Sequence, residues 1–193
     1  MSRIHLGQKK TARGCSCSSD VVTKIVLPDK KLVVDFLFLD LQTCDRCLGA
    51  DDVLNEAIQD VEHVLSLAGY EIVLRRIEIT DERMAEKYKF LASPTIRLNG
   101  TDICLAVKEN ACRSCGDISG QSTDCRVFVF DGKEYEVPPK AMLIDALLRA
   151  VYGPERHAHR PNQYVLPDNL KRFFEGKRNK AEGLCCGITK CSC

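Results

Sequence analysis

The apolar positions of this chain form continuous runs in some segments and helical repeats in others, a pattern typical of an α/β domain. Residues 32–41 are apolar on both faces and rich in Val, Leu and Phe, which predicts a buried strand. Apolar residues at helical spacing then predict a helix over 51–68, which Gly69 ends as a C-cap. A second strand over 71–79 and a short helix over 81–89 follow.

The second half of the chain predicts two hairpins and one further helix. Strands over 95–98 and 101–107 flank Asn99-Gly100, and Asn-Gly between apolar runs is a strong hairpin signal. A second hairpin spans 126–137, and Pro139 opens a helix with a single apolar stripe. The predicted order is therefore β-α-β-α-β-β, an inserted hairpin and a last helix.

The charge balance and the N-terminal sequence narrow the range of partners and cell compartments that we expect for this protein. The chain has 193 residues with 28 Lys and Arg against 27 Asp and Glu, so its net charge of +1 favours neither a nucleic-acid nor a membrane partner. It begins Met-Ser-Arg-Ile-His without the apolar run of a secretory signal, and its longest apolar stretch is too short to span a bilayer. We therefore expect a cytoplasmic protein in a reducing compartment, where structural disulfides are rare.

Cysteine is the residue whose count stands out, because the chain has 12. In a cytoplasmic protein such a surplus indicates thiol redox chemistry or soft-metal binding. The pattern divides the chain into an N-terminal arm (1–24), a domain (25–175) with an insertion at 108–137, and a C-terminal tail (176–193). Both ends lack apolar periodicity, so we expect flexible arms. The cysteines form four groups: Cys15 and Cys17; Cys44 and Cys47; Cys104, Cys112, Cys115 and Cys125; and Cys185, Cys186, Cys191 and Cys193.

Cys44 and Cys47 form a CxxC between a predicted strand and a predicted helix, the arrangement that thiol–disulfide exchange requires. Two intervening residues allow the sulfurs to close a disulfide, and the positive end of a helix stabilises a thiolate. Arg46 lowers and Asp45 raises a nearby thiol pKa, which leaves the net direction open. Asp51 is also a good N-cap, and a helix that begins after it leaves the CxxC in a loop. The alternatives to redox or soft-metal chemistry are an unreactive reduced pair and half of a zinc site.

These segments resemble those of thioredoxin-fold proteins. The resemblance rests on FLFLDLQTCDRCLGADDVLNEAI and LASPTIRLNG, and it covers about residues 31–175. The chain is more closely similar to a prokaryotic thioredoxin-like family of unknown function, whose pattern includes the later CxxCG, the CR pair and YVLPDNLKRFF. The resemblance implies a thioredoxin-like β-α-β-α-β-β-α fold with an inserted cysteine-bearing hairpin.

The resemblance also implies roles for three residues. Cys44 is expected to be the exposed attacking thiol and Cys47 the buried resolving thiol. Pro94, in Ser-Pro-Thr, is expected to be the cis-proline beside them. The chain departs from thioredoxin at the two residues between the cysteines, which are Asp-Arg, and in the absence of a Trp before them.

The third cysteine group has the form of a metal knuckle. Cys112 and Cys115 are two residues apart before a glycine, Cys125 follows, and Cys104 precedes them. Tetrahedral zinc takes four ligands, and these four are the nearest set along the chain. The alternatives are an open three-thiolate site for a soft ion such as arsenite, mercuric ion or Cu⁺, and a second redox pair. Cys104 is alternatively a buried strand residue without a ligand role.

The tail thiols Cys185, Cys186, Cys191 and Cys193 suggest a carrier. We expect about 18 Å of reach for a flexible spacer between Phe174 and Cys185, enough for the tail to deliver an ion or an oxidising equivalent to the first CxxC. The alternative is a solvated tail whose thiols are incidental.

Two hypotheses of function follow. The first is a thiol–disulfide oxidoreductase that uses Cys44 and Cys47 on a protein disulfide substrate or redox partner. The second is a binding or chaperone protein for a soft metal or metalloid ion, such as arsenic, mercury, copper or zinc, with no other cofactor indicated. The sequence has no GxxxxGK, GxSxG, HExxH or GxGxxG motif, so nucleotide, hydrolase and zincin functions lack support.

Overall fold

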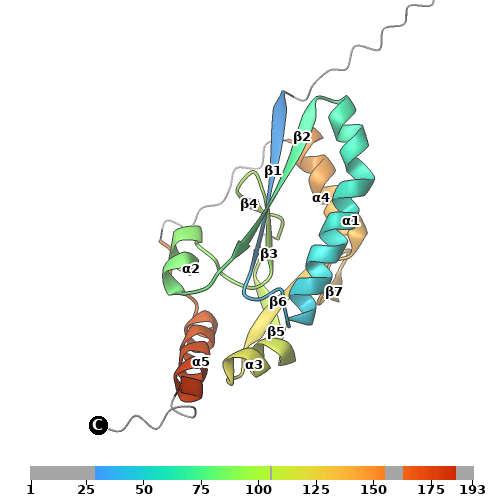
Figure 1. Cartoon of the computed structure of the whole chain (residues 1–193). Coiled ribbons are helices and arrows are strands. Elements are labelled where there is room, and N and C mark those ends of the chain that lie inside the picture. The colour runs from blue at the N-terminus through green and yellow to red at the C-terminus, as the bar shows by residue number, and fades with distance from the viewer. Residues whose placement is uncertain (1–28, 105, 155–162, 186–193) are drawn as a thin grey trace, which may run out of the picture.

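The computed structural model describes residues 29–104, 106–154 and 163–185, and a four-stranded sheet lies at its centre (Figure 1). Its strands are β1 (Lys30–Phe38), β2 (Tyr70–Glu78), β3 (Thr95–Leu98) and β4 (Thr101–Asp102), in the order β2-β1-β3-β4. β1 runs parallel to β2 and antiparallel to β3, which pairs antiparallel with β4. The continuous apolar sequence of β1 follows from this central place, because both of its faces are buried.

Helices cover both faces of this sheet. α1 (Asp45–Leu67) and α4 (Lys140–Tyr152) pack against each other on one side, and α2 (Glu82–Tyr88) lies on the other (Figure 1). The buried positions of α1 recur at helical spacing, which is the apolar stripe that the sequence predicts. The side chain of Asp81 caps α2 by accepting a hydrogen bond from the Met84 N–H at 2.9 Å.

A smaller antiparallel sheet, in the order β5-β6-β7, lies near the start of α1 (Figure 1). It consists of β5 (Lys108–Ala111), β6 (Asp124–Phe130) and β7 (Lys133–Tyr135), and α3 (Arg113–Ser119) connects β5 to β6. The turn between β6 and β7 has Asp131 and Gly132 at φ +50° and +74°, and the turn between β3 and β4 has Asn99 and Gly100 at φ +49° and +81°. Both predicted hairpin turns are therefore confirmed.

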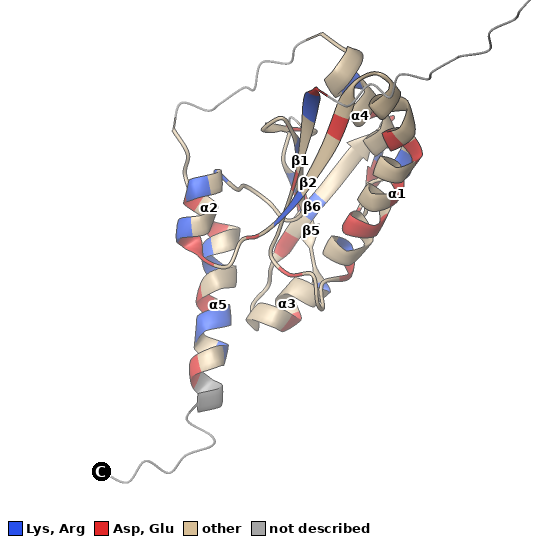
Figure 2. Ribbon diagram, turned by 45° about the horizontal axis from the view of Figure 1, so that its top comes forward, with Lys and Arg blue, Asp and Glu red and all other residues tan. Residues whose placement is uncertain are grey.

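The last helix, α5 (Asp168–Cys185), packs against α3 and α2 and runs past α3 (Figures 1 and 2). Its first half contributes three residues to the core, Leu170, Phe173 and Phe174. Lys, Arg, Asp and Glu dominate its remaining positions, as Figure 2 shows. No helix in the described ranges is long and apolar enough to cross a membrane.

The structure corrects four predicted boundaries. The strand predicted over 101–107 is β4, which ends at Asp102. α1 begins at Asp45 and not at residue 51 or 52, because Cys47 and Ala50 extend its buried stripe and Gly49 faces Val137, where a Cβ would come within 2.9 Å. The inserted segment is a hairpin preceded by a strand and a helix, since Cys112-Arg-Ser-Cys115-Gly forms the first turn of α3. Residues 176–185 of the predicted flexible tail belong to α5. The predicted order of the first six elements is confirmed.

Candidate metal centre

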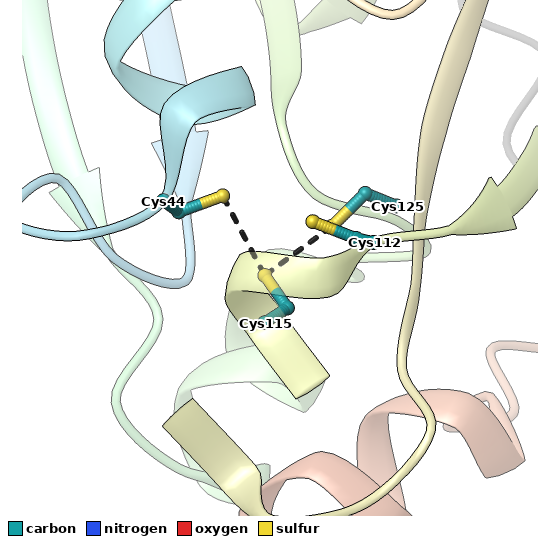
Figure 3. Close-up of side chains that lie close together, drawn as sticks. All are labelled: Cys44, Cys112, Cys115 and Cys125. Carbon is teal, nitrogen blue, oxygen red and sulfur yellow. Dashed lines mark hydrogen bonds between the residues drawn. The ribbon is translucent and has the colours of Figure 1, made fainter. Parts of the chain in front are cut away.

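Four cysteine sulfurs meet where the small sheet approaches α1. The Sγ atoms of Cys44, Cys112, Cys115 and Cys125 all lie within 4.8 Å of one another (Figure 3). The Cys115 thiol donates a hydrogen bond to Cys44 Sγ at 3.6 Å, and the Cys125 thiol donates to Cys115 Sγ at 3.3 Å. All four are buried, and each is a free thiol in the structure.

The loop between β1 and α1 positions Cys44. One carboxylate oxygen of Asp40 accepts hydrogen bonds from the backbone N–H groups of Gln42, Thr43 and Cys44, at 2.9, 2.6 and 3.2 Å. These bonds draw the chain into a tight turn that ends in Cys44, the N-cap residue of α1. Because the first amides of a helix lack an intrahelical acceptor and carry partial positive charge, a thiolate at Cys44 is stabilised there.

The first turn of α3 positions Cys112 and Cys115. Cys112 is the N-cap residue, and its N–H donates to the Thr123 carbonyl at 2.8 Å, which ties it to the strand that carries Cys125. Residues three apart lie on one face of a helix, so both thiols point the same way. The Ser119 hydroxyl, one turn further along, donates to the Cys115 carbonyl at 3.0 Å.

β6 brings Cys125 to the same place through its neighbour Arg126. The Arg126 N–H donates to the Ser93 carbonyl at 2.6 Å, which joins β6 to the loop before β3. Its guanidinium is 1% exposed and donates to Thr95 and to the Asp102 carboxylate, each at 2.9 Å. The small sheet is thus fixed to the large sheet directly beside Cys125.

Arg46 connects the start of α1 to β5. Its guanidinium donates to the Ala111 carbonyl at 2.8 Å, to the side-chain oxygen of Asn110 and to the Glu136 carboxylate. The side chain is 8% exposed, although it follows Cys44 by two residues and charged side chains rarely lie inside a protein without partners. Because Ala111 directly precedes Cys112, Arg46 holds two of the cysteine-bearing segments against each other.

The clustered thiols perturb one another's protonation. Hydrogen bonds from the thiols of Cys112, Cys115 and Cys125 hold the pKa of Cys44 well below its usual range. The thiols of Cys115 and Cys125 lower the pKa of Cys112 to about 7. Neighbouring thiols, Cys112 first among them, together with burial raise the pKa values of Cys115 and Cys125. A cation that binds all four sulfurs must therefore displace protons from the last two.

The structure places the predicted redox pair differently from expectation. Cys44 is fully buried, so the expectation of an exposed attacking thiol is wrong; α3 and its cysteines cover it. Cys47 is also buried, as expected, and its Sγ lies 3.3 Å from the hydroxyl oxygen of Ser93, outside the four-sulfur cluster. Cys44 beside it and burial raise the pKa of Cys47. The Ser93–Pro94 peptide bond is cis, as the resemblance implied.

The predicted zinc set requires one correction. Cys104 does not join Cys112, Cys115 and Cys125; Cys44 takes its place. β4 ends at Asp102, whose carboxylate accepts a hydrogen bond from the Cys104 N–H, and this turn leaves Cys104 half-buried near Arg126. Burial raises the pKa of the Cys104 thiol.

Almost all of the cysteines near the two ends of the chain lie outside the residues that the structure describes. Cys15 and Cys17 of the N-terminal arm, and Cys186, Cys191 and Cys193 of the tail, fall outside the described residues, and of Cys185 only its place as the last residue of α5 is described.

The cluster has the dimensions of a tetrahedral thiolate site. A Zn–S bond of about 2.3 Å places tetrahedral sulfurs about 3.8 Å apart. The two hydrogen-bonded sulfur pairs, at 3.6 and 3.3 Å, are already at or below that separation, and the widest pair needs to close by about 1 Å from its limit of 4.8 Å. The arrangement can therefore hold one metal ion with small side-chain movements, or can form a disulfide between neighbouring members.

Sequence reasoning found three of the four cluster cysteines as a set and missed their supporting residues. The sequence assigned Asp40 no role, Arg126 entered only through the CR pair of the resemblance, and Arg46 was considered only for its effect on thiol pKa. One signal was available: Asp40 precedes Cys44 by four residues in a turn sequence, and Asp commonly accepts from backbone N–H groups there. The partners of Arg46 and Arg126 are distant in sequence, and nothing local indicates them.

Comparison with known proteins identifies a family and no relative of known function. No curated protein and no solved structure matches the chain. Residues 32–147 match the family described as "Domain of unknown function (DUF2703)". This match runs from β1 into α4, so it includes all four cluster cysteines and more than half of the chain. The chain therefore belongs to the DUF2703 family.

Proposed function

We propose that the protein binds one soft metal ion through the thiolates of Cys44, Cys112, Cys115 and Cys125. The observation that carries this proposal is the meeting of four buried sulfurs from three separate segments within 4.8 Å. A buried cysteine by itself behaves as a small apolar residue and needs no sulfur neighbour. Four that converge, two of them on the first turn of one helix, have the donor set of a closed thiolate site.

Zn²⁺ is the ion that this donor set fits best. Four thiolates in tetrahedral array are typical of structural zinc, and the burial of all four leaves no open position for a substrate. Zinc with four thiolates carries a charge of about −2, which a dry interior disfavours unless donors surround it. The N-terminal amides of α1 supply partial positive charge at Cys44, and the guanidinium of Arg46 binds the carbonyl of Ala111, the residue directly before Cys112.

Other soft ions suit the same thiols. Arsenite, mercuric ion and Cu⁺ prefer thiolates and accept fewer than four ligands. Cys112, Cys115 and Cys125 are held together on the small sheet and α3, so they offer a three-thiolate subset to an ion that does not bind Cys44. The proposed function is thus soft-metal binding, with Zn²⁺ as the first ion to test.

The experiment is a metal titration of cysteine-to-serine variants. We expect the chelator-treated full chain to take up one Zn²⁺ at the cluster, and serine at position 44, 112, 115 or 125 to lower the affinity by more than about 100-fold, beyond the usual cost of a supporting residue. Matched controls are Cys47→Ser and Cys104→Ser, which remove thiols outside the cluster. Competition with a chromophoric chelator gives each affinity.

The same variants can also refute the proposal. If the four cluster variants bind Zn²⁺, Cd²⁺ and Cu⁺ as tightly as the two controls, the cluster holds no metal. A second expected result concerns stability: Zn²⁺ should raise the melting temperature of the full chain, because binding energy at a site that joins α1, α3 and β6 is also folding energy.

A thiol–disulfide oxidoreductase is the second candidate. Its support is the order β2-β1-β3-β4 with a CxxC at the start of α1, which fits the thioredoxin-like fold that the sequence resembles. In this reaction the Cys44 thiolate attacks a substrate disulfide, a mixed disulfide forms, and Cys47 releases the reduced product. α3 must first move away from Cys44, which is fully buried. Disulfide reductase activity that Cys44→Ser abolishes in metal-free protein would favour this candidate.

A further inference from the structure

A surface hollow of about 610 Å³ lies between α3 and α5, directly beside the sulfur cluster. Its lining includes Cys112, Gly116, Gly120, Gln121 and Lys180. Among the four cluster cysteines, Cys112 is 5% exposed and the other three are 0% exposed. Cys112 therefore borders a hollow that opens to solvent, whereas the other three cysteines are closed off from it.

α5 forms one wall of this hollow and is fixed against α3. Gly176 packs on the backbone of Ser119, where a Cβ would come within 2.3 Å of the carbonyl oxygen. One turn further, the Lys180 ammonium donates a hydrogen bond to the Asp117 carbonyl, and its methylene carbons lie beside Gly120. The position of α5 is thus set as far as Lys180, five residues before the helix ends at Cys185.

The sequence after α5 is short and rich in thiols. Residues 186–193 read CGITKCSC. The end of the helix lies about 8 Å beyond Lys180 along its axis, at 1.5 Å per residue. Cys191 is six residues past that end, about 20 Å of extended chain, and Cys193 has about 26 Å. Both can return to the hollow, whereas Cys186, one residue past the end with less than about 4 Å of chain, cannot.

We propose that residues 186–193 occupy this hollow and that Cys191 and Cys193 pass a soft metal ion to the cluster, with Cys112 as the entry ligand. This inference rests on the proposed metal-binding function. It replaces the flexible spacer and the Cys44–Cys47 acceptor that the sequence suggested, because the spacer is helical and Cys44 has no route to solvent of its own. The occupant is the chain's own tail, since the hollow lies within its reach.

The transfer is a ligand exchange with balanced charge. A divalent ion held by the two tail thiolates gains a bond to Cys112 as one bond to a tail sulfur breaks. Cys115, Cys125 and Cys44 then replace the remaining tail sulfur. Each cluster thiol that is protonated before the transfer gives up its proton as it binds the ion. The two tail thiolates that the ion leaves take up two of these protons, and any others enter solvent. No oxidant or reductant takes part.

The tail is tested by loading kinetics with Cd²⁺ alone as the probe. Metal-free protein receives less than one equivalent of Cd²⁺, an exposed-site chelator is added at successive times, and the Cd²⁺ that the protein retains is counted. We expect the chelator to strip an ion that only tail thiols hold, whereas an ion in the buried cluster is retained. We expect Cys191→Ser/Cys193→Ser to load the cluster at least about tenfold more slowly than the full chain, because delivery from a tethered carrier proceeds at high effective concentration.

Two matched controls isolate the tail and its reach. Cys186→Ser should load as fast as the full chain, because that thiol cannot reach the hollow. Cys15→Ser/Cys17→Ser removes two thiols from the other arm and should also load at the full rate. If the Cys191/Cys193 variant loads as fast as these controls, the delivery inference is wrong.

The entry role of Cys112 has its own comparison. Cys112→Ser and Cys44→Ser each leave three cluster thiols, but only the first removes the residue that lines the hollow. We expect Cys112→Ser to load at least about tenfold more slowly than Cys44→Ser, and equal rates would overturn the entry role.

Failure of this inference differs from failure of the proposed function. If the cluster binds Cd²⁺ at equilibrium but every tail variant loads it at the same rate, the metal-binding proposal is supported and the tail-delivery proposal is wrong. If no variant retains Cd²⁺ after long incubation, the proposed function itself fails. A loading rate that rises with protein concentration would show transfer between two copies of the chain and would overturn intramolecular delivery.

Discussion

Replacing Arg46 by Met tests whether the protein itself positions the four cluster cysteines before a metal ion binds. Arg46→Met keeps an apolar stem of similar length and removes the guanidinium that joins α1 to the segment carrying Cys112. The change leaves all four thiols in place. Its effect therefore reports on how the segments are positioned and not on the number of ligands.

The structure gives the expected size of the effect. The bond from Arg46 to the Ala111 carbonyl, at 2.8 Å, involves a buried charged donor and is worth about 1.5–3 kcal/mol. The ion pair with Glu136 contributes about 0–1 kcal/mol, because that carboxylate side chain is 58% exposed and screened by water. The sum is about 1.5–4 kcal/mol of unfolding free energy, which corresponds to a melting temperature lower by about 3–16 °C.

Metal affinity should fall together with stability. Arg46 acts on the ligands as a supporting residue, and loss of such residues costs about 10- to 100-fold in affinity. The assay is thermal unfolding followed by circular dichroism, with and without a chelator, and competition for Zn²⁺ with a chromophoric chelator. Arg149→Met is the matched control, because Arg149 pairs with Asp145 on the exposed face of α4, far along the chain from the cluster.

The outcome that would refute this reasoning is specific. If Arg46→Met melts within about 1 °C of Arg149→Met and binds Zn²⁺ equally well, the guanidinium does not position the cluster, since surface changes usually stay within about 0.5 kcal/mol. If stability falls and affinity does not, Arg46 supports the fold alone.

Two further predictions follow from the same structure. Gly176→Ala should lower the unfolding free energy by about 1–3 kcal/mol in urea denaturation, because the new methyl group would overlap the Ser119 carbonyl, whereas Glu175→Ala on the exposed side of α5 should have little effect. In metal-free protein, alkylation of Cys112 by iodoacetamide should rise with pH and reach half its maximal rate near pH 7, since the thiolate is the reactive form and neighbouring thiols lower its pKa to about 7. Cys47, whose pKa Cys44 and burial raise, should stay unlabelled over that range in mass spectrometry, and equal labelling of both would contradict the assignment.

The parts of the fold that the sequence predicted are those with local causes. The continuous apolar run of β1 and the period-3.6 pattern of α1 reflect which faces of each element are buried, and the two hairpin turns depend on residues that adopt positive φ. Cys112, Cys115 and Cys125 were recognised as a set because they lie close together in the chain. Each of these inferences uses fewer than about twenty residues at a time.

The parts that the sequence did not predict depend on distant contacts. Cys44 joins the cluster because the Arg126 N–H pairs β6 with the Ser93 carbonyl, which fixes the small sheet beside the start of α1. α3 has seven residues, too few for an apolar period to emerge. The polar second half of α5 remains helical through Gly176 on Ser119, Lys180 on the Asp117 carbonyl and Arg178 paired with Glu82 at 3.1 Å.

Cys44 is the residue at which the two candidate functions exclude each other. A buried thiolate bound to a metal is a weaker nucleophile and lacks the access that attack on a disulfide requires, and a Cys44 sulfur in a disulfide no longer offers a thiolate ligand. Metal occupancy therefore blocks any dithiol chemistry at the first CxxC, while oxidation of Cys44 removes one of four ligands. α3 covers Cys44 through the same cysteines that complete the cluster. The packing of α3 against Cys44 therefore both closes the metal site and buries the thiol. If the first CxxC carries out thiol–disulfide exchange, we therefore expect the activity in the metal-free form alone, and we expect Zn²⁺ to inhibit it with the affinity of the cluster.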